Sequence, residues 1–171
     1  MKVQDLIQEL EETKHYLLFK EQNPETFFAA AFLILDTESK TEQIQLDYFL
    51  PSSNKIAAFC HPFTEPKIHD NIISVQAGKT EPITPTLMQT QTTEIKIDID
   101  DLEKTSNKLI KENNSGIKPT KIIAILKDDT WNLTCMDNAL GIVRLKINAI
   151  TEELLNFNKG SLMDFMGAKK K

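Results

Sequence analysis

The residues whose chemistry best suits a metal ion gather in one stretch of the chain. Cys60 and His61 are adjacent, His69 follows a little later, and a second cysteine, Cys135, lies far along the sequence. Thiolate and imidazole groups are the ligands that zinc prefers. The spacing is neither Cys-x-x-Cys nor His-x-x-x-His, and two prolines interrupt the stretch. A small metal-binding protein or enzyme using Cys60, His61 and His69 is therefore the least favoured of our hypotheses.

A nucleophile paired with a base is also disfavoured. Adjacent residues of a strand point to opposite faces of a sheet, so His61 cannot activate the thiol of Cys60. No Gly-x-Ser-x-Gly motif, phosphate-binding loop or dinucleotide fingerprint occurs in the sequence. We read Cys60 and Cys135 as small apolar residues of a core. We expect no enzyme activity, no catalytic residue, no metal ion and no cofactor.

Three carboxylates precede a predicted helix. Asp98, Asp100 and Asp101 stand where a helix has free amide hydrogens and the positive end of its dipole. Helix capping accounts for this cluster better than acid–base chemistry does. Asp98 or Asp100 is the residue expected to accept the amide hydrogens.

The C-terminal segment carries a short apolar motif followed by lysines. Leu162, Phe165 and Met166 fall on one face of a helical turn, which suits insertion into the hydrophobic groove of a partner. The motif resembles the sliding-clamp-binding peptide (PIP box), with Lys159 at its glutamine position. The resemblance implies an accessory factor recruited to a DNA sliding clamp through residues 159–166. The alternative is that this turn folds back onto the protein's own sheet.

The elements that would position these residues can be predicted from hydrophobic periodicity. Residues 3 to about 20 carry the apolar stripe of a helix, which Asn23-Pro24 ends. Residues 26–35 form an uncharged run typical of a central strand covered on both faces. Residues 44–48 alternate between apolar and polar, as a half-buried strand does, and 56–60 predict a further strand.

The second half of the chain repeats this order. Ile95, Ile97 and Ile99 alternate with polar residues and predict a strand that leads into a helix, which ends at residues 113–116. Alternation and turn residues then predict three strands, at residues 121–127, 131–136 and 142–147.

These patterns predict the α+β class, with two helix-plus-antiparallel-meander units (αβββ twice) and the helices packed on one face of an antiparallel sheet. The expected organisation is a first unit at 1–61, a Pro/Thr-rich connector at 62–92, a second unit at 93–158 and an amphipathic tail at 159–171. The repeat is one of shape, since the halves share few identities.

The second unit resembles the PepSY domain, a small helix-then-meander module. The resemblance covers residues 100–155 and lies in the helix, the strand at 130–134 and the exit at 147–154, where the family has an Asp-Ala-x-Thr-Gly-x-hydrophobic ending. Asn148 stands at the position of the family's Asp, and Glu152 at that of its Gly. Residues 3–61 would be a more divergent copy. The resemblance implies regulation or inhibition of peptidases, by modules that are mostly extracytoplasmic.

Charge and composition limit the partners. The net charge is −5, which argues against direct nucleic-acid binding. No apolar run has the length of a membrane helix, and the first residues do not read as a signal peptide, so we expect a cytoplasmic protein with reduced cysteines and no membrane partner.

The functional hypothesis that these observations favour is a non-enzymatic protein-binding or regulatory module. An antiparallel sheet with helices on one side leaves its other face or an edge open to a protein partner. Gln45 with Asp47, and Arg144 with Lys146, are expected on the open face. The sequence leaves the identity of the partner and the oligomeric state open.

Overall fold

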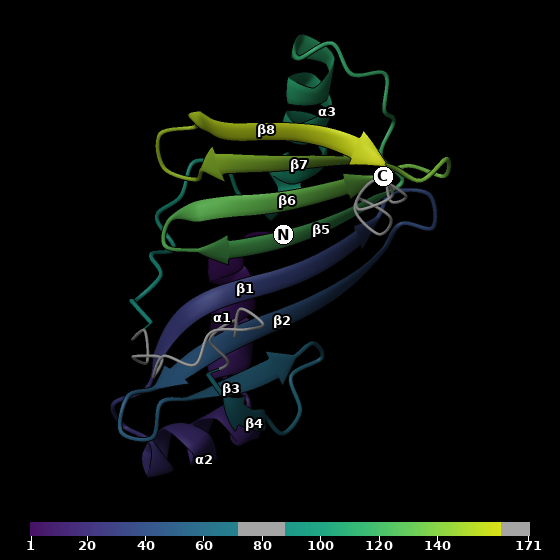
Figure 1. Ribbon diagram of the computed structural model, residues 1–171. Helices are drawn as coiled ribbons and strands as arrows, with labels where there is room; N and C mark the ends of the chain where they lie inside the picture. Colours follow the sequence, from purple (N-terminus) through teal and green to yellow (C-terminus); the bar gives the residue numbers. More distant parts are fainter. Residues whose placement is uncertain (72–87, 162–171) are drawn as a thin grey trace, which may run out of the picture.

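In the computed structural model, which describes residues 1–71 and 88–161, one antiparallel sheet of eight strands lies in front of three helices (Figure 1). The helices and the first four strands are α1 (Val3–Glu11), α2 (Lys14–Gln22), the short 3-10 helix η1 (Ile99–Asp101), α3 (Leu102–Glu112), β1 (Phe27–Asp36), β2 (Thr41–Leu50), β3 (Lys55–Cys60) and β4 (Lys67–Asp70). The remaining strands are β5 (Lys121–Lys127), β6 (Thr130–Met136), β7 (Gly141–Asn148) and β8 (Leu154–Ser161). The expected α+β class is confirmed.

The strand order places the junction between the two halves at the centre of the sheet. The order is β4-β3-β2-β1-β5-β6-β7-β8, so each half is a meander and β1 pairs with β5. Each meander has four strands, and the expectation of three in each is wrong. β4 and β8 lie at the two edges of the sheet, so each of them pairs with one neighbouring strand only. Neither β4, which is exposed along its length, nor the polar β8 shows the alternation by which strands are recognised.

The predicted first helix is two helices. α1 ends at Glu11, and α2 begins after Thr13, whose hydroxyl accepts a hydrogen bond from the Tyr16 amide at 3.1 Å. The change of direction takes Leu17 and Leu18 off the buried stripe, and they are 58% and 49% exposed. Tyr16 and Phe19 take their place against the sheet.

The predicted strand at Ile95, Ile97 and Ile99 is also wrong. The amides of Lys96 and Ile97 both donate to one carbonyl, that of Ala149, at 2.8 and 3.1 Å, and no ladder forms. Ile97 and Ile99 are nevertheless buried, and the Ile97 carbonyl accepts from the indole nitrogen of Trp131 at 2.7 Å. Alternating burial here reflects an extended segment packed across the sheet.

The main core lies between the sheet and the helices. Trp131, Leu33 and Leu46 from the sheet pack there with Leu6 and Leu102 from the helices, all with exposed fractions of 1% or less. Burying side chains of this size stabilises the folded state by roughly 1.5–3 kcal/mol each. This layer fixes which side chains of the strands point away from the helices.

Candidate binding sites

The helix-free face of the sheet has an apolar centre. Phe32 and Ile34 of β1 lie directly opposite Ile125 and Ile123 of β5, and alternation along the strands points all four away from the core. We call these four residues the central apolar block. Ile125 is 37% exposed and the other three are half-buried. The expectation that residues 26–35 are covered on both faces is therefore wrong for Phe32 and Ile34.

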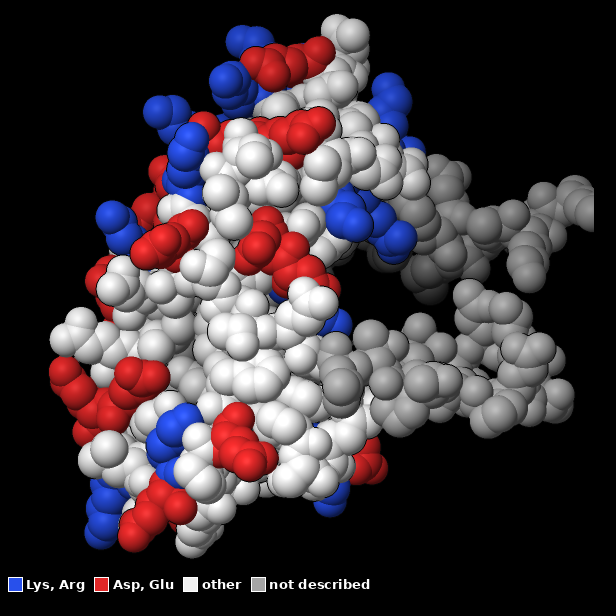
Figure 2. Space-filling model, turned by 90° about the vertical axis from the view of Figure 1, so that its left-hand side faces the viewer, with Lys and Arg blue, Asp and Glu red and all other residues white. Residues whose placement is uncertain are grey.

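Polar and basic side chains continue the same rows toward β7. Ile125 lies opposite Asn132, and Asn132 opposite Lys146; Ile123 is followed in the same way by Thr134 and then Arg144. Arg144 and Lys146 are exposed, and both lie on the helix-free face as predicted. Figure 2 shows basic side chains on this side of the molecule, which is at the right of that view, at the height of β6 and β7.

The other side of the block is neutral or acidic. Gln43 and Gln45 of β2 lie opposite Ile34 and Phe32, and Asp47 follows on the same face, as predicted. Burial is the main cause that raises the pKa of the Asp47 carboxyl above its usual range, although a hydrogen bond from Gln45 at 2.8 Å opposes it. The helix-free face thus changes in charge from acidic at β2 to basic at β7.

A second apolar cluster closes part of this face. Phe49 of β2 and Ile56 of β3 are almost fully buried on the helix-free side, together with Met88 and the half-buried Phe27. The ring of Phe49 lies 5.6 Å from that of Phe27, centroid to centroid. The central apolar block is separate from this cluster.

The proposed metal ligands are not brought together. Cys60 lies at the end of β3 on the helix-free face, with its thiol 3.7 Å from the side-chain oxygen of Gln45. His61 contacts Glu9 of α1 at 3.3 Å, which is on the helix side, and His69 lies on the edge strand β4. Within residues 1–71 and 88–161, no three His, Cys, Asp or Glu side chains are placed to hold a metal ion.

The two cysteines differ in environment. Cys135 is fully buried in the core, as expected, and burial raises the pKa of its thiol to about 12, so the thiol is inert at neutral pH. Cys60 is exposed, and its reading as a core residue is wrong. The reason is register: Cys60 falls on the helix-free side, at the end of its strand.

The apolar motif of the C-terminal segment lies outside the described residues. This applies to Leu162, Phe165 and Met166, so recruitment to a sliding clamp remains a prediction. Lys159 belongs to β8, where it lies opposite Val143 of β7. Gly160 and Ser161 continue the pairing of β8, opposite Ile142 and Gly141.

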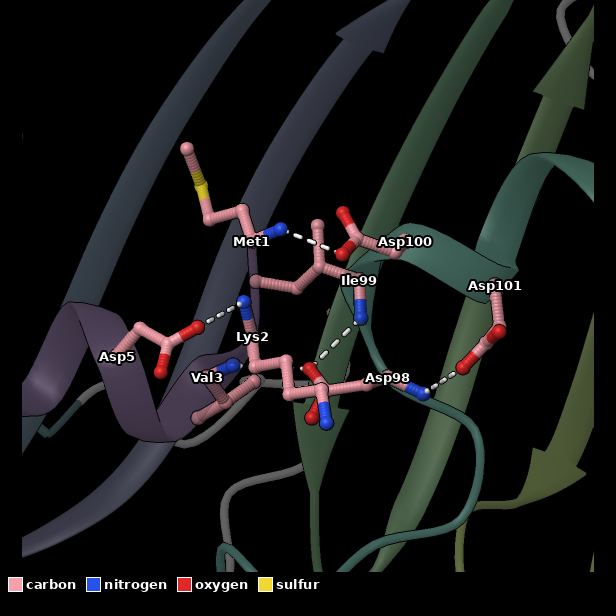
Figure 3. A network of polar contacts seen from close by, with 8 residues as sticks. All are labelled: Met1, Lys2, Val3, Asp5, Asp98, Ile99, Asp100 and Asp101. Carbon is pink, nitrogen blue, oxygen red and sulfur yellow. Dashed lines mark hydrogen bonds and ion pairs between the residues drawn. The ribbon is translucent and has the colours of Figure 1, made fainter.

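Two of the three carboxylates before α3, Asp98 and Asp101, act as caps, and Asp98 joins two helices (Figure 3). One oxygen of Asp98 accepts hydrogen bonds at 2.8 Å from the amides of Ile99, in η1, and Val3, in α1. The carboxylate of Asp101 accepts from the Asp98 amide, and that of Asp100 contacts the amino group of Met1. Capping by Asp98 was predicted; its contact with α1 was not. The arrangement is structural, since its acceptors are used within the fold.

Sequence reasoning missed the central apolar block as a surface. The strands of Phe32, Ile34, Ile123 and Ile125 were predicted, but their mutual pairing was not. The available signal was the apolar character of both faces of residues 26–35, which we assigned to burial.

None of the helices in residues 1–71 and 88–161 combines the length and the apolar character that spanning a membrane requires.

Comparison with known proteins adds little. No protein-family model matches the chain, and no curated protein shows a significant match to it. Among solved structures, a protein of Clostridium difficile 630 described as a "putative lipoprotein" is similar, with a TM-score of 0.49 and 11% sequence identity. The similarity covers 94% of this chain and 93% of that one. At this level of likeness we draw no conclusion from it.

Proposed function

We propose that this chain is a non-enzymatic protein-binding module that resembles PepSY domains and that its helix-free sheet face binds an amphipathic segment of another protein. The observation that carries the proposal is the central apolar block, which lies where both halves of the sheet meet. Partly exposed apolar side chains that form one contiguous group are typical of protein-interaction surfaces.

The charges beside the block indicate the chemistry of the partner. In the two rows that run from Phe32 and Ile34 across β5 to β7, the charged side chains are Arg144 and Lys146. A bound segment that presents apolar residues to the block would therefore gain from Asp or Glu residues on its β7 side. We infer a partner segment that is amphipathic and acidic.

Two local features support the PepSY resemblance at the two positions, Asn148 and Glu152, where the sequence departs from the family. The side-chain oxygen of Asn148 accepts the amides of Ile150 and Thr151, each at 2.9 Å, as the family's Asp can. Glu152, at the family's Gly position, has a φ of 68°, a left-handed conformation that glycine adopts without strain. The turn thus keeps the geometry for which the family's residues are suited.

We also propose that the two halves are one unit repeated. Each half begins with helix and continues as a four-stranded meander, and the first strands of the two meanders, β1 and β5, pair with each other. A cytosolic location remains part of the proposal, and the unpaired state of Cys60 and Cys135 is compatible with it.

A selection from a random peptide library displayed on phage tests the binding proposal. We expect the peptides enriched on the wild-type protein to combine apolar residues with Asp or Glu. An Ile125→Asp variant should bind them at least about 10-fold more weakly, because it places a charge in the block. Reversing the charges with R144E and K146E together should shift the enriched peptides toward Lys and Arg.

The matched control is Leu17→Asp, which introduces the same charge at an exposed leucine of α2. It should leave peptide binding unchanged. The proposal is wrong if no peptide is enriched, or if the enriched peptides bind the Ile125→Asp variant as well as they bind the wild type. Circular dichroism of each variant shows whether the fold is intact.

A further inference from the structure

The main chain of the strands beneath the central apolar block is already paired on both sides. β1 pairs with β2 and β5, and β6 pairs with β5 and β7, so the helix-free face presents side chains to a partner and not a sheet edge. An extended segment lying on this face would have its own N–H and C=O groups over apolar side chains without partners, which is costly. A helix satisfies these groups internally. The face therefore suits a helical segment.

The exposed cations of β7 lie at a fixed distance from the block. Arg144 and Lys146 are both exposed, and one strand, β6, separates them from Ile123 and Ile125 of β5. Neighbouring strands of a sheet are about 4.8 Å apart, so β7 lies about 10 Å from β5 and about 14 Å from β1. A partner that uses both the block and the cations must span this distance.

This distance decides the direction of the bound helix. A helix with its side chains is about 10–12 Å wide, so a helix lying along β1 and β5 covers the block but extends only about as far as β6. A helix lying across the strands passes over the block, β6 and β7 in turn. On the opposite face of the sheet, α1 and α3 also run across the strands (Figure 1). With a rise of about 1.5 Å per residue, the distance of about 10–14 Å corresponds to roughly two turns or slightly more.

The two cations would lie on either side of the axis of such a helix. Lys146 continues the cross-strand row of Phe32, and Arg144 continues the row of Ile34, so the two cations are about 7 Å apart along β7. Two acidic residues that are adjacent in a helix project about 100° apart, so one can reach each cation. Exposed ion pairs of this kind contribute mainly to the choice and register of the partner.

We propose that the partner segment is an α-helix that lies across the strands of the helix-free face. Its apolar residues contact the central apolar block, and two adjacent acidic residues about two turns away lie over Arg144 and Lys146. This inference rests on the proposed binding at the block. It adds the conformation of the partner, its direction on the sheet and the spacing between its apolar and acidic residues.

Three synthetic peptides of equal length on an alanine and glutamine background test this inference by calorimetric titration of the full chain. The first peptide has leucines on one face of two consecutive turns and two adjacent glutamates about two turns further along that face. The second has the same composition with the glutamates beside the leucines, and the third is the first with a central proline that breaks the helix. The first peptide should bind about 10-fold more tightly than either of the others. Its helix content, measured by circular dichroism, should rise on binding.

Charge reversal on β7 tests the placement of the acidic residues. R144E and K146E together should abolish the difference in affinity between the first and second peptides. The matched control is K104E with K111E, which reverses two exposed lysines of α3, on the other side of the sheet. This control should keep the difference. Ile125→Asp should weaken the first and second peptides alike, because both use the block.

Four results would overturn the inference: equal binding of the first and second peptides, tight binding of the proline peptide, an unchanged preference in the R144E and K146E protein, or no binding of any of the three. A dimer of the peptide-free protein that Ile125→Asp dissociates would also overturn it, because a second copy would then cover the block. The proposed function is judged separately, by the phage-selected peptides and their loss of binding to Ile125→Asp. If those peptides bind as expected and the helical peptides do not, only the helical arrangement is wrong.

Discussion

Near the two ends of α1, buried polar groups differ in their hydrogen bonding. At its start, a buried carboxylate, Asp98, accepts two amides and completes the caps of two helices. Beyond its end, a buried hydroxyl, that of Tyr48, has no partner among the described residues. Both residues are nine-tenths buried or more. The first is fully used by the fold, whereas the second has only the Tyr16 hydroxyl beside it and makes no hydrogen bond of full geometry.

This difference separates buried polar groups that are fully hydrogen-bonded within the fold from those that are not. A buried polar group that is hydrogen-bonded within the chain stabilises the fold, and removing it leaves its partners unsatisfied. A buried polar group without a partner destabilises the unliganded fold, and removing it relieves that cost. The sign of the change in stability on removal therefore tells the two kinds apart.

The largest effect is expected from Asp98→Ala. The amides of Val3 and Ile99 would lose their acceptor inside the protein, and the free energy of unfolding should fall by about 3 kcal/mol. Urea unfolding followed by circular dichroism measures this. Asp98→Asn keeps the side-chain oxygen and should cost about 1 kcal/mol. Equal losses in the two variants would show that the charge, and not the acceptor, matters.

A smaller effect of opposite sign is expected from Tyr48→Phe. Removing the unpartnered hydroxyl should raise the free energy of unfolding of the unliganded protein by about 1 kcal/mol. Tyr16→Phe is the matched control, because that hydroxyl has a partner in Glu11 and its removal should destabilise. If both variants lose stability to the same degree, Tyr48 has a partner and the contrast with Asp98 does not hold.

The smallest change in stability is expected at Asp47, which is partly buried and accepts a hydrogen bond from Gln45. Burial raises its pKa above the ordinary 3.8, so the folded state keeps a proton that the unfolded state releases. Relative to the ionised form, the protonated carboxyl stabilises the folded state, and this stabilisation is fully present below the pKa of the unfolded state. It is lost as the pH rises through the pKa of the folded state. Asp47→Asn should therefore raise stability at neutral pH by less than about 1 kcal/mol.

The measurement is thermal unfolding of the wild type and Asp47→Asn at a series of pH values from acid to neutral. The difference between the proteins should grow as the pH rises and then level off. A difference that instead shrinks toward neutral pH would mean that the carboxylate is stabilised by the fold, as Asp98 is.

How much of the fold could be predicted depended on whether the information was local. The capping role of Asp98 follows from its place before a helix, but its bond to Val3 joins residues 95 apart, which no local pattern encodes. The alternation at Ile95, Ile97 and Ile99 correctly predicted burial and incorrectly predicted pairing, because periodicity reports the faces of an extended segment and not its hydrogen bonds.

The candidate sites were less predictable for the same reason. Ile123 and Ile125 are ordinary strand residues until β5 pairs with β1 and brings them beside Phe32 and Ile34. In the same way, the sequence places Tyr48 on a strand but does not show whether its hydroxyl finds a partner. Arg144 and Lys146 were assigned correctly, because alternation within one strand decides which face they occupy.

The central pairing of β1 with β5 makes the two halves dependent on each other. β1 is the most apolar strand of the sheet, and in a separated first half it would be an unprotected edge able to pair with any other chain. Each half supplies the edge that the other lacks. Exchange of halves between two copies would satisfy the same edges, but the covalent connection gives the half in the same chain the higher effective concentration.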